Sequence, residues 1–349
     1  MRIRVHGALA VLIVAHATAQ QPGDLNKANR DSLAAHRISS TTLRGEVVVD
    51  DTAIGSPRSL ATQGHFLWIA DRNGPPFVHV VDVQSDRVVA SYGAKGEGPG
   101  DFAGFPRLSI RPGEPSNGWG YDEHLRRMTP LPEAARSAEP STLGLPADRS
   151  LYDLRWNSHD RLLGVTDMDT SRYVVYDASG KLVDRFLGGL LGNSDIPILS
   201  RRSASNGFSF CSAGDGRHAA VTFVAAGRIE LVDASTHTLR RAAVPFASDG
   251  GFTHAPDGRW TFDHGTRYYA DCAATSRHLY ALFVGKAFAA TGGRAVAADY
   301  LQMFDWTGRL EAVYLLDQPM STLTVSGDSV VYAGGTEVTA IYRFRLPRP

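Results

Sequence analysis

The chain has little cysteine, no excess of either charge and no long apolar segment in its interior. Its 349 residues carry 36 basic and 36 acidic side chains, and this balance argues against general nucleic-acid binding, which requires a basic surface. The two cysteines, Cys211 and Cys272, could form one disulfide in an oxidising compartment. Their spacing does not establish that they lie within bonding distance, so a disulfide and two buried free thiols both stay open.

One short apolar run lies at the N-terminus. Arg2 and Arg4 precede residues 7–15, which read GALAVLIVA and are too few to span a bilayer. The small residues Ala17 and Ala19 then form a cleavage-site pattern. This arrangement is typical of a secretory signal peptide, and we expect an exported protein, periplasmic or secreted.

The sequence divides into three regions. Residues 1–19 are the expected signal peptide. Residues 20–42 are polar and without periodicity, which favours a flexible tether. Residues 43–349 form the expected folded domain. No later segment is long and apolar enough to cross a membrane, so no transmembrane segment is expected.

The folded region shows no long stretch with a helical apolar period. Short runs rich in Val, Ile, Leu, Phe and Tyr alternate instead with Gly, Asp and Asn turns, a pattern that predicts β-strands. Examples are His65–Ala70, Val78–Val83, Arg172–Tyr176, Arg228–Val232 and Tyr300–Phe304.

These runs recur at an interval near fifty residues. Pro57 and Pro106 lie 49 positions apart in matching segments, and Asp71 and Asp122 lie 51 apart. An interval of this size with about four strands per unit indicates a β-propeller blade. We expect six blades, near residues 55–93, 104–135, 150–188, 207–245, 266–316 and 320–349.

The last blade contains only three obvious strands, the last of them at 340–346. Residues 44–49, at the start of the domain, would supply the fourth strand. Pairing the two ends closes the ring and removes an exposed edge. The expected fold is therefore all-β, a six-bladed β-propeller with N-to-C strand closure of the last blade.

Residues 55–110 carry a family resemblance. The segments Leu67–Asn73, Val78–Asp82, Tyr92–Phe102 and Phe105–Arg107 follow one another as in an NHL-type repeat. They are also similar to exported bacterial six-bladed TolB-like propellers, which carry a G-x-G-P-G-[DE]-F loop. Over the remaining blades the resemblance is one of architecture only.

The glycine-rich segment Gly93–Gly98 has spacing like that of a phosphate-binding loop. The next two residues are Pro and Gly, where such a loop needs Lys and Ser or Thr. Glu97 and Asp101 would also repel phosphate. We therefore predict a connection between the outer strand of one blade and the inner strand of the next, with Phe102 as an apolar plug between blades.

Arg58 and Arg107 are the main ligand candidates. Each follows a proline at the start of an innermost strand, where side chains can point into the central channel. Two guanidiniums on adjacent blades could hold a carboxylate, a phosphate or a sugar acid, or could instead bond to carbonyls or to Asp71 and Asp122. The candidate ligand-binding residues at the channel mouth are Arg58, Asp71, Arg107, Asp122, Arg267 and Tyr268, of which the last two open the fifth blade.

The histidines give a weak metal signal. His65, His218 and His278 precede strands in three different blades, which favours a repeated turn residue. His254 and His264 share a long connection from which both could reach the channel mouth and hold a metal.

Asp167 and Asp169 imitate the start of a calcium loop. Arg172 and Ala178 stand where that loop needs Gly and Glu. An ordinary loop is the favoured interpretation. No metal site and no cofactor are assigned, with calcium or zinc left as the alternatives.

No catalytic residue is assigned, because the sequence lacks G-x-S-x-G, H-E-x-x-H and C-x-x-C. The favoured function is an exported, non-catalytic binding propeller with a protein, peptide or glycan ligand on the face of the Gly-rich loop. The alternative is a metal-dependent hydrolase or lyase in the channel, for which lactonase-type and peptide-amidating-lyase-type propellers are precedents by architecture. RNA binding conflicts with the signal peptide and the zero net charge.

Overall fold

The computed structural model describes most of the chain from Ser40 onward. The described residues are 40–50, 52–114, 117–132, 142–146, 151–166, 171–186, 207–244, 252–258, 260–262, 265–287, 297–335 and 339–347. The expected signal peptide and most of the expected tether lie outside them. No helix in these ranges is long and apolar enough to cross a membrane.

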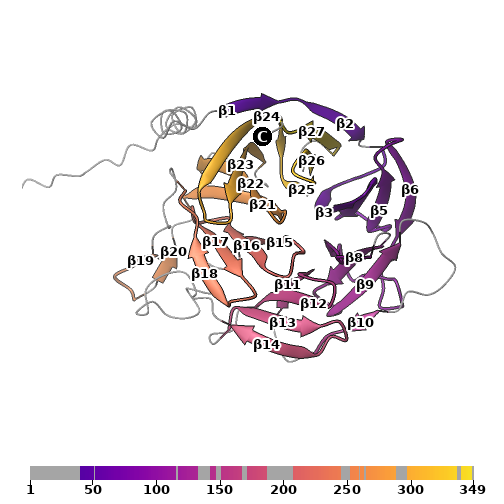
Figure 1. Cartoon of the computed structure of the whole chain (residues 1–349), viewed down its shortest axis with the longest axis horizontal. Coiled ribbons are helices and arrows are strands. Elements are labelled where there is room, and N and C mark those ends of the chain that lie inside the picture. Colours follow the sequence, from indigo (N-terminus) through magenta and orange to yellow (C-terminus); the bar gives the residue numbers. More distant parts are fainter. Residues whose placement is uncertain are drawn as a thin grey trace, which may run out of the picture.

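Six antiparallel sheets stand around a central axis and form a six-bladed β-propeller (Figure 1). In blades 1 to 4, the strands follow one another in sequence from the axis outward. Blade 1 contains β3 (Pro57–Gln63), β4 (Phe66–Asp71), β5 (Val78–Asp82) and β6 (Arg87–Tyr92). Blade 2 contains β7 (Arg107–Ile110), β8 (Asn117–Asp122), β9 (Arg127–Pro132) and β10 (Leu143–Gly144). Blade 3 contains β11 (Leu151–Trp156), β12 (Arg161–Thr166), β13 (Tyr173–Asp177) and β14 (Leu182–Phe186).

The second half of the ring repeats this plan with additions. Blade 4 contains β15 (Phe208–Ser212), β16 (His218–Phe223), β17 (Ile229–Asp233) and β18 (Thr238–Arg241). A hairpin of β19 (Phe252–His254) and β20 (Trp260–Phe262) follows. Blade 5 contains β21 (Thr266–Ala274), β22 (His278–Ala287), β23 (Ala298–Asp305), β24 (Leu310–Met320) and β1 (Ser40–Leu43). Blade 6 contains β25 (Thr322–Ser326), β26 (Val330–Gly334), β27 (Ile341–Arg345) and β2 (Gly45–Val49).

The expected closure of the ring is confirmed. Strand β2 pairs antiparallel with β27 as the outer strand of blade 6. Across this junction, the Arg343 guanidinium lies 3.1 Å from the Glu46 carboxylate and 3.2 Å from that of Asp86 in blade 1. Strands β2 and β27, far apart in the sequence, thus complete one sheet, which Arg343 ties to blade 1.

Three features of the sheets differ from the expectation. Residues 40–42, assigned to the tether, belong to strand β1, which pairs parallel with β24 and covers that edge of blade 5. Blade 2 ends with β10 at Gly144 rather than near residue 135, because a two-residue strand leaves almost no pattern in a sequence. The β19–β20 hairpin was not predicted for the same reason: its strands have three residues each.

The Gly-rich loop joins β6 to β7, as predicted. Phe102 is fully buried and packs with Trp68 and neighbouring apolar side chains of blades 1 and 2. Gly93 has φ +85°, and a β-carbon there would lie 2.6 Å from the Phe102 ring, so only glycine fits. Arg127 donates hydrogen bonds to the carbonyls of Glu97 and Gly98, which holds the loop against blade 2.

One buried charge cluster lies between blades 3 and 4. Glu230 is completely buried, and its carboxylate accepts a hydrogen bond from the Tyr173 hydroxyl at 3.0 Å. The same carboxylate bonds to Arg228 and lies 3.7 Å from Nε of Arg172. Both guanidiniums are buried, so Glu230 supplies the negative charge that makes their burial tolerable.

We therefore expect Glu230→Gln to lower the free energy of unfolding by about 3–5 kcal/mol, because it leaves buried positive charge uncompensated. Chemical denaturation at neutral pH measures this. Glu46→Gln is the control, since the Glu46–Arg343 pair is more than half exposed on the Glu46 side and should contribute about 1 kcal/mol or less. Equal losses for the two variants would contradict the role given to Glu230.

Candidate functional site

A cavity of about 400 Å³ lies at the centre of the ring. It is lined by residues of the innermost strand of every blade, namely β3, β7, β11, β15, β21 and β25. A cavity of this size falls within the range of small-molecule sites. Its wall is partly polar and carries charges of both signs.

Arg58 and Arg107 both line this cavity, on neighbouring blades, as the sequence predicted. Both side chains are half-buried, and neither forms a hydrogen bond or ion pair with any other described residue. The Nε atom of Arg58 is completely shielded and still has no acceptor. Burial, with repulsion from Arg72 and Arg107, lowers the pKa of the Arg58 guanidinium. An anion bound in the cavity would offset both the burial of the Arg58 guanidinium and its repulsion from the neighbouring arginines.

Asp71 and Asp122 do not line the central cavity, and neither pairs with the two arginines. Each ends the second strand of its blade and is buried. Asp71 accepts backbone hydrogen bonds from Gly55 at 2.6 Å and Ser56 at 2.8 Å, and Asp122 accepts one from Ala103 at 2.7 Å. These carboxylates hold the connection that leads into the inner strand, and so they set the position of the arginines.

Arg267 and Tyr268 also lie outside the cavity wall. Tyr268 is buried in the apolar core between blades 4 and 5, and its backbone N–H donates to the Val224 carbonyl at 2.8 Å. The cavity is lined instead by residues 271–274 at the end of β21 and by the next two residues, Thr275 and Ser276.

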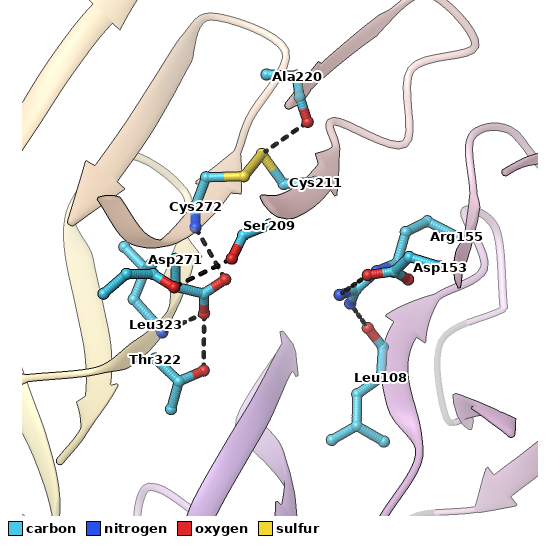
Figure 2. The surroundings of a disulfide bond; sticks show 11 residues. Leu108, Asp153, Arg155, Ser209, Cys211, Ala220, Asp271, Cys272, Thr322 and Leu323 are labelled. Atoms are coloured by element: carbon cyan, nitrogen blue, oxygen red, sulfur yellow. Dashed lines mark hydrogen bonds and ion pairs between the residues drawn. A yellow bond between two sulfur atoms is a disulfide. The ribbon is translucent and has the colours of Figure 1, made fainter. Parts of the chain in front are cut away.

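Asp271 is a cavity residue that the sequence did not reveal. Its carboxylate accepts hydrogen bonds from Cys272 N at 2.9 Å, Leu323 N at 3.0 Å and the Thr322 hydroxyl at 2.7 Å (Figure 2). Burial raises the pKa of Asp271, although these hydrogen bonds and attraction to Arg155 oppose the shift. The surroundings of this carboxyl group thus disfavour its ionised form relative to water.

Arg155 faces Asp271 from the other side of the cavity (Figure 2). Its guanidinium forms two hydrogen bonds with Asp153, at 2.9 and 3.0 Å, and a third with the Leu108 carbonyl. Because Asp153 neutralises it, Arg155 adds little net charge to the wall. The uncompensated charges are those of Arg58, Arg107 and Asp271.

Cys211 and Cys272 form a disulfide, which decides between the two states that the sequence left open. Their α-carbons are 5.8 Å apart. The bond joins β15 of blade 4 to β21 of blade 5, beside Asp271 in the cavity wall (Figure 2).

The position of Asp271 repeats a pattern of the inner strands. In blade 1, the Ser59 hydroxyl accepts a hydrogen bond from Leu108 N at 2.9 Å, and in blade 2 the Ser109 hydroxyl accepts one from Trp156 N at 2.9 Å. Asp271 makes the same link from blade 5 to Leu323 in blade 6. A neutral hydroxyl serves this purpose elsewhere, so the carboxylate brings a charge that the link does not require.

His218 and His278, two of the histidines that precede strands, do not lie together. His218 contacts Asp215 at 2.7 Å and stacks on Trp306, whereas His278 lies between Asp328 and Glu311, at 3.2 Å from each. Within the described ranges, no three His, Cys, Asp or Glu side chains are arranged to hold a metal ion. His264, Asp167 and Asp169 lie outside the described residues.

Six sheets around a polar, ligand-sized cavity define this protein as a β-propeller with a central cavity. The chain belongs to the family described as TolB-like 6-blade propeller-like, whose model matches residues 39–328. This confirms the TolB-like part of the sequence resemblance. The resemblance of residues 55–110 to an NHL-type repeat stays a prediction.

Solved structures support the same fold. A protein from Bacteroides fragilis NCTC 9343 that is described as exported matches with a TM-score of 0.52 at 13% identity, over 89% of this chain and 95% of that one. Streptogramin B lyase matches with a TM-score of 0.50 at 13% identity, over 87% and 98%. U3-55K matches with a TM-score of 0.51 at 12% identity, over 83% and 95%. At these identities the likeness shows the fold alone, and no curated protein sequence matches the chain.

The raised pKa of Asp271 leads to a pH-dependent prediction. The Asp271 carboxyl group binds its proton more tightly in the native state than in the unfolded chain, where the pKa of an aspartate side chain is about 3.9. The contribution of Asp271 to stability is therefore greatest below that value and is lost as the pH rises through the folded-state pKa. In Asp271→Asn this loss is absent, so the Tm of the variant minus that of the wild type should increase between pH 4 and pH 7. Thermal unfolding across that range measures the difference, and a constant difference would contradict the shift.

Proposed function

We propose that this protein is an exported binding propeller that holds an anionic group of its ligand between Arg58 and Arg107. The observation that carries the proposal is the pair of guanidiniums without a described partner on the wall of a central cavity. Charge-assisted hydrogen bonds to a carboxylate or a phosphate are the interactions that such a pair provides. Acidic peptides and sugar acids carry groups of this kind.

Asp71 and Asp122 have a supporting role in this proposal. Their hydrogen bonds to backbone amides fix the segments that lead to Pro57 and Pro106, and thereby the direction in which the arginines leave the wall. Arg155 is paired with Asp153, so its charge is neutralised and it is not available to bind an anion. The anion subsite therefore consists of two residues.

Export is supported by two independent features. The Cys211–Cys272 disulfide is the kind of bond that persists in oxidising compartments such as the periplasm and the extracellular space. The N-terminal sequence has the basic, apolar and small-residue order of a signal peptide. We propose that the mature protein acts in the periplasm or outside the cell.

The anion subsite predicts binding of simple acids. Isothermal titration at low ionic strength with citrate, glucuronate and inorganic phosphate should detect at least one of them. The double variant Arg58→Gln/Arg107→Gln should weaken that binding by about tenfold or more, since each lost charged hydrogen bond costs about 1.5–3 kcal/mol. Added salt should weaken binding to the wild type.

The control is Arg87→Gln/Arg240→Gln, which removes the same charge from exposed positions on β6 and β18. It should bind as the wild type does. Equal affinity of the wild type and the Arg58/Arg107 variant, or absence of binding by all three acids, would argue against the proposed site.

Processing of the N-terminus gives a second prediction. Intact mass spectrometry of protein from the periplasm or medium should show a chain that begins near Gln20. Ala17→Arg/Ala19→Arg should block cleavage, because the site requires small residues, while Ala34→Arg should not. Recovery of uncleaved protein in the cytoplasm alone would contradict export.

A further inference from the structure

The uncompensated charges in the cavity lie on opposite sides of it. Arg58 and Arg107 come from blades 1 and 2, and Asp271 comes from blade 5. In a ring of six blades, blade 5 stands opposite blade 2, and Figure 1 shows β21 across the axis from β8 of blade 2. The wall is therefore positive on one side and acidic on the other.

These groups also lie at similar heights along the axis. Hydrogen bonds link the inner strands in turn, from Ser59 to Leu108, Ser109 to Trp156, Ser212 to Asn157 and Ser209 to Ala270. Following these links around the ring places Asp271 at about the height of Ser59, next to Arg58. Because a strand rises roughly 3.3 Å per residue, these groups differ little in height, and a ligand that spans the cavity can contact both sides.

Asp271 has capacity for a further donor. Its two oxygens offer roughly four acceptor positions, and three donors occupy them: two backbone N–H groups and the Thr322 hydroxyl. Among the described residues, no basic side chain forms an ion pair with it, because Arg155 is bound to Asp153 and Leu108. Asp271 is half-buried, and a carboxylate withdrawn from water without a cation is stabilised by a ligand that supplies one.

The charge on Asp271 is not explained by the architecture. Ser59 and Ser109 make the corresponding links between blades with hydroxyl groups. A serine at position 271 could accept the hydrogen bond of Leu323 N in the same way, without the cost of a buried charge. The carboxylate is therefore better explained by something that binds in the cavity.

We propose that the cavity selects a zwitterion, of the class of small amino acids and short peptides, with its carboxylate on Arg58 and Arg107 and its ammonium on Asp271. This inference rests on the anion subsite of the proposed function and adds the second half of the ligand. An acid that lacks the ammonium pairs with the arginines on one side of the cavity and leaves the half-buried Asp271 without a cation.

The test compares acids that carry an ammonium group with related acids that lack it. Isothermal titration of the mature chain, with its disulfide intact, uses 4-aminobutyrate against butyrate, 6-aminohexanoate against hexanoate, and glycylglycine against N-acetylglycylglycine. We expect at least one amino acid or dipeptide to bind about tenfold more tightly than its partner without the ammonium, since a hydrogen bond between charged groups is worth at least that factor.

The variant Asp271→Ser tests whether Asp271 causes the preference for ligands that carry an ammonium group. The variant keeps an acceptor for Leu323 N and removes the charge, so it should bind both members of a pair with equal affinity. Asp271→Asn is a second variant of nearly the same shape and should behave alike. Arg58→Gln/Arg107→Gln should instead weaken binding of both members.

The outcomes separate the two proposals. If each pair binds equally to the wild type, and binding still depends on the arginines, the zwitterion inference is overturned while the anion subsite stands. If the preference survives in both Asp271 variants, the role of Asp271 is overturned. If no acid binds here or in the titrations with citrate, glucuronate and phosphate, both proposals fall.

Discussion

The pairing of β2 with β27 is the interaction on which the rest of the structure depends. A ring of radially arranged sheets keeps its geometry only if the last sheet is complete, because an incomplete blade leaves an unpaired edge and a gap beside blade 1. Strand β2 fills that place, and Arg343 then links blade 6 to Glu46 and Asp86. With the ring fixed, six inner strands are held side by side around one cavity.

The inner strands are joined by side chains as well as by packing. Ser59, Ser109 and Asp271 each accept a backbone hydrogen bond from the next blade, and the disulfide joins blades 4 and 5 covalently. These links make the cavity wall a rigid part of the fold. A rigid wall can hold uncompensated charges at fixed positions, which is the requirement for recognising a small ligand without rearrangement.

Most of the fold and part of the candidate site could be predicted from the sequence. Blade number, strand closure, the plug role of Phe102 and the turns with Asp and Gly between strands were predictable because each depends on a local pattern in the sequence. In the structure, Asp177 accepts hydrogen bonds from Ser179 N and Lys181 N, and Gly180 has φ +79°, as such a turn requires. Arg58 and Arg107 were found because they follow matching prolines.

Asp271 and Arg155 were missed because their significance depends on what lies across the ring. Neither stands at a motif or at the start of a strand, and Asp271 lies five residues into a nine-residue strand. Conversely, Arg267 and Tyr268 stand where the motif analogy placed them, but β21 is longer than the other inner strands and its early part lies outside the cavity. The repeat of the sequence predicts where a residue lies within its own blade. It does not predict which residues of distant blades face it across the cavity.

The closure described above also sets an order for biosynthesis. Glu46 and Arg343 are 297 residues apart in sequence, so β2 is made long before its partner β27. While the chain is being synthesised from its N-terminus, β2 has no partner and the ring stays open. Blade 6 is therefore complete only when β27 is present, and a chain that stops before β27 leaves β2 as an unpaired strand.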